Sequence, residues 1–151
     1  MKAGRELDAL VDQGEFRITK GKRIDVLVAE SVMGLKFCGP GNEEKQLHVE
    51  FVEDLDRAAL VLHRCSRNEK GEAAWASFQP ATSFRDAFEV VEKMRSRGWL
   101  KFELVQDPVE ACWIAFFYNL STYHRDFAVA VTPTEAICLA ALKAVGVEVP
   151  A

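Results

Sequence analysis

Residues 132–146 read TPTEAICLAALKAVG, and this stretch decides the fold more clearly than any other part of the chain. Thr132 can act as N-cap, and Glu135 completes a capping box. Pro133 suits the first helical position because an N–H there would have no partner within the helix, so the N–H that proline lacks is not missed. Gly146 stands where a helix commonly ends in the left-handed conformation. Nearly every position between these ends is apolar, and a helix that is apolar all round must be covered all round.

Two strands are expected before this helix, at 111–118 and 127–131, and a third at 99–105. The side chains of the 111–118 strand are apolar on both faces. Those pointing one way are Trp113, Ala115 and Phe117, and those pointing the other way are Cys112, Ile114, Phe116 and Tyr118. Such a strand is usually central and covered on both sides. Because a small chain has little with which to cover both this strand and the last helix, we expect a homodimer or a larger homo-oligomer.

The remaining elements follow from periodicity and from turn residues. Residues 22–33 predict a helix that stops at Gly34, and Ser83 caps an amphipathic helix that stops at Gly98. Hairpin-linked strands are expected at 47–52, 59–62 and 73–78, and a short helix and strand at 6–11 and 15–19. The residues expected to be nearly fully buried are Phe88, Val91, Trp113, Phe116, Leu139 and Leu142.

Three blocks of the sequence, residues 24–34, 80–94 and 132–149, resemble the phage ABA-sandwich domain family in content and in order. The resemblance implies an α+β fold in which an antiparallel β-sheet is sandwiched between α-helices, in a protein of a phage or prophage. The length of the chain fits one domain over residues 1–151, and the resemblance covers about residues 24–149 of it. Residues 1–23 look like an N-terminal extension, and the segment 35–79 looks longer than usual. The family brings no activity that transfers residue by residue.

Composition excludes several classes of protein. The 151 residues are 49% hydrophobic and 28% charged, which is globular and argues against disorder. A net charge of −4 gives no basic footprint for duplex nucleic acid. Charged residues directly after Met1 exclude a signal peptide, and no apolar run is long enough for a membrane span. We therefore expect a protein of the host cell cytoplasm with no membrane partner, whose four cysteines are reduced.

No motif predicts a metal site, a cofactor or a catalytic residue. Cys38, His48, His63 and Cys65 are chemically suited to zinc, but their spacing matches no known zinc motif. No cysteine lies in a nucleophile signature, and Gly34, Gly39 and Gly41 follow a helix with no phosphate-loop lysine. The acidic group Glu50, Glu53, Asp54 and Asp56 is best interpreted as a solvated face.

The polar segment 119–126 joins two apolar strands and is the preferred candidate site. Tyr123 offers a stacking face, His124 a group that donates and accepts, and Arg125 a fixed charge for a phosphate or carboxylate. Binding residues concentrate on loops held by rigid scaffolds. Arg95 and Arg97, at the end of the preceding helix, are expected to be able to join this site. The alternative interpretation is a plain solvated hairpin.

The leading functional hypothesis is a non-enzymatic phage or prophage accessory protein that acts by binding. In one version, a symmetric oligomer sequesters a small nucleotide-like ligand of host defence signalling, which is a counter-defence role. In a second version, the protein binds a host protein directly. The enzymatic alternative is a small hydrolase or nuclease built on histidine and carboxylate residues of the middle segment.

Overall fold

The computed structural model describes residues 20–35, 47–54, 57–67 and 73–149, with side chains described for 20–21, 23–35 and 77–149. The elements are α2 (Lys20–Ser31), β1 (Leu47–Asp54), β2 (Arg57–Arg67), β3 (Ala73–Ser77), α3 (Phe84–Ser96), β4 (Lys101–Asp107), β5 (Cys112–Asn119), β6 (His124–Ala130) and α4 (Pro133–Ala144). The helix and strand expected at 6–11 and 15–19, and Cys38, lie outside the described residues. The side chains of His48, His63 and Cys65 are likewise not described.

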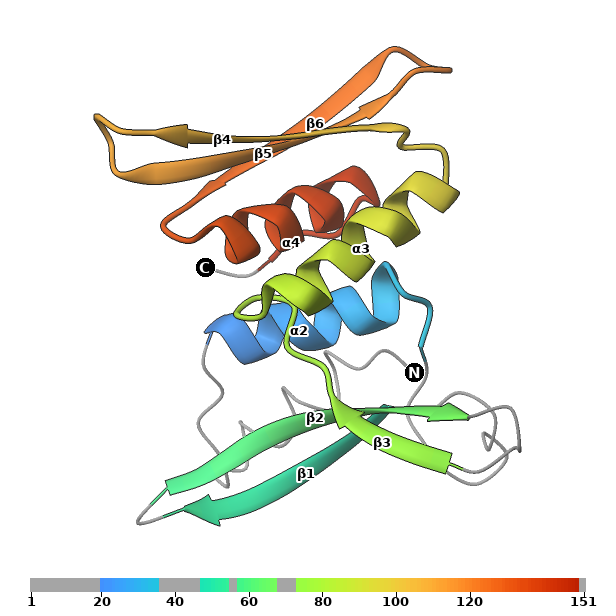
Figure 1. Cartoon of the computed structure of the whole chain (residues 1–151), viewed down its shortest axis with the longest axis vertical. Helices are drawn as coiled ribbons and strands as arrows, with labels where there is room; N and C mark the ends of the chain where they lie inside the picture. Colours follow the sequence, from blue (N-terminus) through green and yellow to red (C-terminus); the bar gives the residue numbers. More distant parts are fainter. Residues whose placement is uncertain (1–19, 36–46, 55–56, 68–72, 150–151) are drawn as a thin grey trace.

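The described strands form two antiparallel sheets, one in the order β1-β2-β3 and the other in the order β4-β5-β6. The three helices lie in the middle of the molecule, with one sheet on either side of them (Figure 1). Helix α4 packs directly on β5 and β6. The expected α+β class, with an antiparallel sheet packed against helices, is confirmed.

Helix α4 begins and ends where its sequence predicts. The Thr132 hydroxyl accepts a hydrogen bond from the Glu135 N–H at 3.3 Å, and Pro133 opens the helix. Gly146 has φ +81°, a conformation that glycine adopts without steric cost. Helix α4 contacts α2 and α3 on one side and β5 and β6 on the other. These elements supply much of the cover that we expected from a second subunit.

A small polar network ties the three helices together. The Asp25 carboxylate of α2, only 1% exposed, accepts a hydrogen bond from the Ala81 N–H at 2.8 Å. The Thr134 hydroxyl of α4 donates to the Ala81 carbonyl at 2.7 Å. At the start of α3, Asp86 accepts from the Gln79 N–H at 2.8 Å. A buried polar group is costly unless it is hydrogen-bonded, so these contacts fix how α2 and α4 meet the loop before α3.

The predicted core is partly wrong. Of its six residues, Leu142 is fully buried, Phe88 is 52% exposed, and the other four are partly buried. Helix α3 turns a different face inward than the one we expected, because Asp86 is held by Gln79 on the inner side. The buried residues of that face are Asp86, Ala87, Val90 and Met94.

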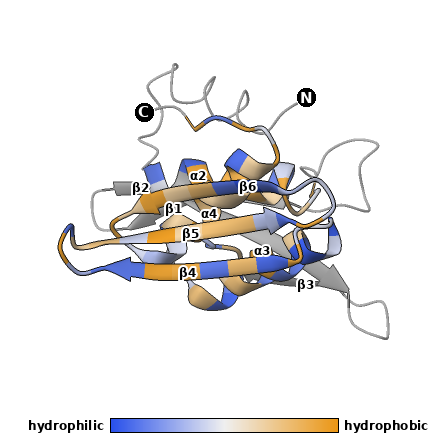
Figure 2. Cartoon of the chain, turned by 90° about the horizontal axis from the view of Figure 1, so that it is seen from above, coloured by the Kyte–Doolittle hydropathy of each residue, from blue (hydrophilic) through white to orange (hydrophobic). Residues whose placement is uncertain are grey.

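Strand β5 is central, as predicted, but its two faces differ. Ala115 and Phe117 point toward the helices and are fully buried. Figure 2 looks down on the opposite side of β4–β6, and no other described helix or strand lies over it. The expectation that both faces of this strand are covered is therefore wrong for the described part of the chain. Within the same part, no helix is long and apolar enough to cross a membrane.

Candidate functional site

The side of β4–β6 that faces away from the helices is the candidate site, and we call it the outer face. Its residues form three cross-strand rows, because opposite positions of antiparallel strands point the same way. Starting from the β5–β6 hairpin, the rows are Lys101, Tyr118 and Arg125; then Glu103, Phe116 and Phe127; then Val105, Ile114 and Val129. The face thus changes from basic and aromatic at the hairpin end to aliphatic at the other end.

Two cations meet around the ring of Phe127. The Arg125 guanidinium lies 5.8 Å from the centre of this ring and 5.7 Å from the centre of the Phe116 ring. The Lys143 ammonium of α4 lies 4.9 Å from the Phe127 ring centre. Within the described residues, neither cation has a carboxylate within ion-pair distance. Phe127 itself is 40% exposed, so both charges lie near an accessible aromatic ring.

At the β4 edge of the sheet, the charges of the first two rows balance each other. The Lys101 ammonium lies 3.1 Å from the Glu103 carboxylate and 5.0 Å from the Tyr118 ring centre. The Tyr118 hydroxyl donates a hydrogen bond to Glu103 at 3.5 Å. Because Lys101 and Glu103 offset each other, the unbalanced positive charge of the outer face lies on its β6 side.

His124 points to the opposite side of the sheet from Arg125. Successive residues of a strand alternate between faces, and His124 directly precedes Arg125. The His124 Nε2 lies 2.9 Å from the Asp126 carboxylate. The centres of the His124 and Trp99 rings are 5.9 Å apart, and the two rings are packed edge to face. The structure therefore does not bring His124 and Arg125 together on one face, although both are at the predicted hairpin.

Tyr123 occupies the hairpin turn, where its side chain is 94% exposed. Its φ of +54° lies in the left-handed region, which bulky residues rarely adopt. The neighbouring turn is held by Asn119, whose side chain accepts hydrogen bonds from the Ser121 and Thr122 N–H groups at 3.1 and 3.3 Å. Tyr123 thus stands next to the first row of the outer face without contacting a core.

The arginines expected to join from α3 do not both reach this region. The Arg97 guanidinium donates to the Ser31 and Val32 carbonyls, at 3.0 and 3.3 Å, and so caps the end of α2. Arg95 is exposed. Lys143 is the residue that sequence reasoning missed. Its position in the last turn of an apolar helix gives no sign that its ammonium approaches the Phe127 ring of β6.

Neither of the two described cysteines has a lowered pKa. Burial is the main cause that raises the pKa of the Cys138 thiol well above its usual value. Desolvation, followed by the charges of Asp107 and Glu110, raises the pKa of Cys112. A reactive cysteine needs a lowered pKa. In the part of the chain with described side chains, no group of three histidine, cysteine or carboxylate residues is placed to hold a metal ion.

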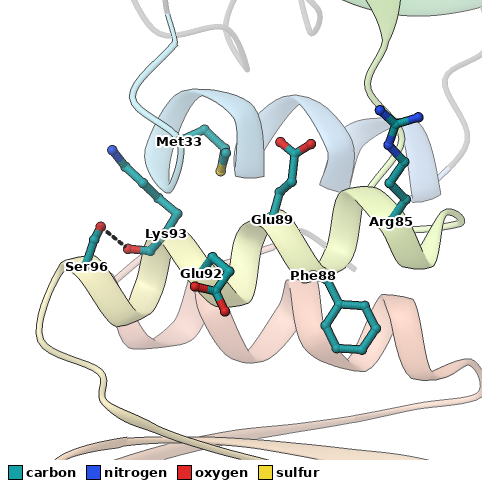
Figure 3. Close-up of a pocket in the computed structure, with 7 residues that line it drawn as sticks. All are labelled: Met33, Arg85, Phe88, Glu89, Glu92, Lys93 and Ser96. Atoms are coloured by element: carbon teal, nitrogen blue, oxygen red, sulfur yellow. Dashed lines mark hydrogen bonds between the residues drawn. The ribbon is translucent and has the colours of Figure 1, made fainter.

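A shallow groove runs along α3, with a volume of about 480 Å³ (Figure 3). Its lining residues are Met33, Arg85, Phe88, Glu89, Glu92, Lys93 and Ser96. Charges of both signs alternate at four-residue spacing along its wall, from Arg85 through Glu89 to Lys93. This alternation suits neither an anion nor a cation, in contrast to the β6 side of the outer face.

Comparison with known proteins agrees with the architecture. The family model of the phage ABA sandwich domain matches residues 26–142. A crystal structure of a phage protein from Bacillus cereus superposes with a TM-score of 0.53 over 89% of this chain and 94% of that chain, at 14% sequence identity. A likeness at that identity shows the fold alone. No curated protein sequence matches this chain.

Proposed function

Because this chain belongs to the phage ABA sandwich domain family, we propose that it is a phage or prophage accessory protein that acts by binding rather than by catalysis. Its ligand is a small nucleotide-like molecule of the host cytoplasm, and sequestering that molecule serves counter-defence. The ligand binds at the hairpin end of the outer face, where Arg125 and Tyr123 are the principal contacts. No membrane or duplex nucleic acid takes part.

One observation carries this proposal: Arg125 lies beside the rings of Phe116 and Phe127 on an open sheet face, and among the described residues no carboxylate lies within ion-pair distance of it. A planar ligand can stack on exposed aromatic rings while an arginine binds its anionic group with two parallel hydrogen bonds. The sheet is already ordered, so binding costs less conformational entropy than it would on a mobile loop.

The backbone at Tyr123 supports a role for this residue. A left-handed conformation costs a non-glycine residue about 1–2 kcal/mol, and the side chain gains almost no buried contact in return. Strained positions cluster at functional sites. Placing a tyrosine, rather than a glycine or asparagine, in this turn is understandable if its ring closes over a ligand bound to the first row.

The chemistry at the site supports binding over catalysis. General acid–base catalysis needs a proton-transferring group near the reacting atoms. The imidazole of His124 at this hairpin pairs with Asp126 on the other side of the sheet from Arg125. The outer face therefore supplies stacking surface and charge rather than a paired acid and base.

Direct binding of a host protein is a second candidate, and a separate observation favours it. Phe84 and Phe88 are about half exposed on α3, with ring centres 6.0 Å apart, and Phe88 lines the groove of Figure 3. Exposed aromatic residues on a helix can anchor a partner protein. Replacing Phe84 and Phe88 would then abolish host-protein binding and leave nucleotide binding intact.

The proposed ligand class is tested by calorimetric titration of the protein with AMP and, separately, with ribose 5-phosphate, which lacks a base to stack. We expect AMP to bind more tightly, and Arg125→Ala to weaken AMP binding by about 1.5–3 kcal/mol. His124→Ala is the matched control, because its side chain points away from the outer face. Equal loss in both variants would place the ligand elsewhere, and unaltered AMP binding by Arg125→Ala and Tyr123→Ala would reject the site.

Self-association is part of the proposal, since the aliphatic row of Val105, Ile114 and Val129 leaves apolar surface open at the far end of the same face. Light scattering at micromolar concentration should give a mass of at least twice the 16.9 kDa of one chain. A monomer mass would contradict this part of the proposal without bearing on the ligand.

A further inference from the structure

We propose that Lys143 is the second cation of the ligand site, and that Arg125 and Lys143 together select a ligand with a terminal phosphomonoester over one with a phosphodiester. This inference rests on the proposed function, because it names the chemical class of ligand for the same site. It adds a residue from α4 to a site otherwise formed by the β5–β6 hairpin.

Two different elements each bring a positive charge to the Phe127 ring. Arg125 belongs to β6 and Lys143 to the last turn of α4, yet both lie close to the Phe127 ring centre, at 5.8 and 4.9 Å. Helix α4 is anchored by the fully buried Leu142 directly before Lys143 and by its contacts with β6. The backbone that carries Lys143 is therefore fixed relative to the strand that carries Arg125.

The charge balance around Phe127 favours an anion with more than one negative charge. Two like charges near one ring repel each other, and the described residues place no carboxylate beside either of them. The nearest acidic residue of the same row is Glu103 on β4, which is held by Lys101 and by the Tyr118 hydroxyl. A ligand anion on the β6 side can neutralise both cations without displacing an existing ion pair.

A phosphomonoester fits this place better than a phosphodiester does. At neutral pH a monoester carries about −1.5 to −2 charges, because its second pKa is near 6, whereas a diester carries a single charge. The attraction to two fixed cations scales with the charge of the ligand. The aromatic rings of Phe116 and Phe127 contribute equally to both ligands, because stacking of the base does not depend on the phosphate.

The test uses adenosine, 3′,5′-cyclic AMP and AMP, which share a base and carry no phosphate, a diester and a monoester. The full chain should bind AMP about three- to tenfold more tightly than cyclic AMP, the size expected when additional negative charge meets two exposed cations. The variant Lys143→Gln should bring this ratio close to one and leave the affinity for adenosine unchanged.

Lys20→Gln is the matched control, since Lys20 is also an exposed lysine but pairs with Glu135 and is not part of the outer face. Its AMP to cyclic AMP ratio should stay within about twofold of the parent. Thermal unfolding of both variants checks that they fold. Equal affinities for AMP and cyclic AMP, or an equal fall of the ratio in the two lysine variants, would overturn the inference while the binding function stands. Failure of all three probes to bind would overturn both.

Discussion

The two faces of the β4–β6 sheet are made of similar residues and have opposite surroundings. On strand β5, Phe117 is fully buried under α4, while its neighbour Phe116 belongs to the open outer face. Both positions are aromatic, so the sequence alone does not say which face is covered. The difference arises from where α4 packs, and no other described helix or strand lies over the outer face (Figure 2).

The largest contrast between the two sides is expected in thiol reactivity. Cys138 is fully buried on α4, and Cys112 lies on the same side of β5 as Phe116. Alkylation of Cys138 requires the structure to open, and with an unfolding free energy of about 5–15 kcal/mol its rate should be at least about a thousandfold below that of Cys112. Iodoacetamide labelling of the native protein, followed by peptide mass spectrometry, gives both rates.

The labelling also has a defined dependence on pH. Because the pKa of Cys112 is raised, its thiolate forms at higher pH than that of an ordinary cysteine. The labelling rate of Cys112 should therefore rise at a higher pH than the labelling rate of an ordinary cysteine does. In the denatured chain without reductant, four thiols should react. Similar native rates at Cys112 and Cys138 would mean that the helix layer is not closed.

The second contrast concerns stability. Phe117→Ala leaves a cavity between β5 and the helices and should lower the free energy of unfolding by about 3–5 kcal/mol. Phe127→Ala removes a ring that is 40% exposed, and should cost about 1 kcal/mol. Urea denaturation of the two variants measures the difference. If Phe127→Ala is as destabilising as Phe117→Ala, the outer face is covered in solution, and a second subunit is the simplest cover.

The third contrast lies within α4. Leu142 is fully buried and Leu139 only partly so, although both were expected in the core. Leu142→Ala should therefore destabilise the protein by about 2–5 kcal/mol, and Leu139→Ala by about half as much. Denaturant midpoints of the two variants test this directly. Equal midpoints would mean that Leu139 is buried against something that the single chain does not contain.

Local sequence signals predicted the helices and strands well. Which side chains are buried depends on long-range packing, and the local signals did not predict it. Thr132 and Gly146 fix the ends of α4 through contacts within a few residues, so the sequence contains that information. The burial of Asp25 depends on Ala81, which is 56 residues away along the chain. The same kind of dependence explains why Phe88 was wrongly assigned to the core.

The candidate site was only partly predicted, because local signals identify its hairpin residues but not how distant elements pack around them. Tyr123, His124 and Arg125 were identified because polar residues between two apolar strands are visible in the sequence. His124 and Arg125 point to opposite faces because strand β6 already starts at His124, and successive residues of a strand alternate between its faces. The approach of Lys143 to Phe127 depends on how α4 crosses β6, and no local pattern encodes that crossing.

The smallest expected effect concerns the β5–β6 turn. It distinguishes a residue with a strained backbone that contacts the ligand from one with a strained backbone that does not. Tyr123 and Ala111 both have positive φ, +54° and +51°, at opposite ends of β5. Glycine removes the steric cost at either position but increases the entropy of the unfolded chain, so Tyr123→Gly and Ala111→Gly should each stabilise the protein by about 0.5–1 kcal/mol. Only Tyr123→Gly should also weaken AMP binding, because Tyr123 lies at the hairpin end of the outer face and Ala111 at the other end of β5. Thermal unfolding and calorimetric titration of the same two samples give both quantities. A stabilised Tyr123→Gly variant that binds AMP as tightly as the parent would show that the tyrosine ring takes no part in the site, and that binding rests on Arg125 and the aromatic rings of the sheet.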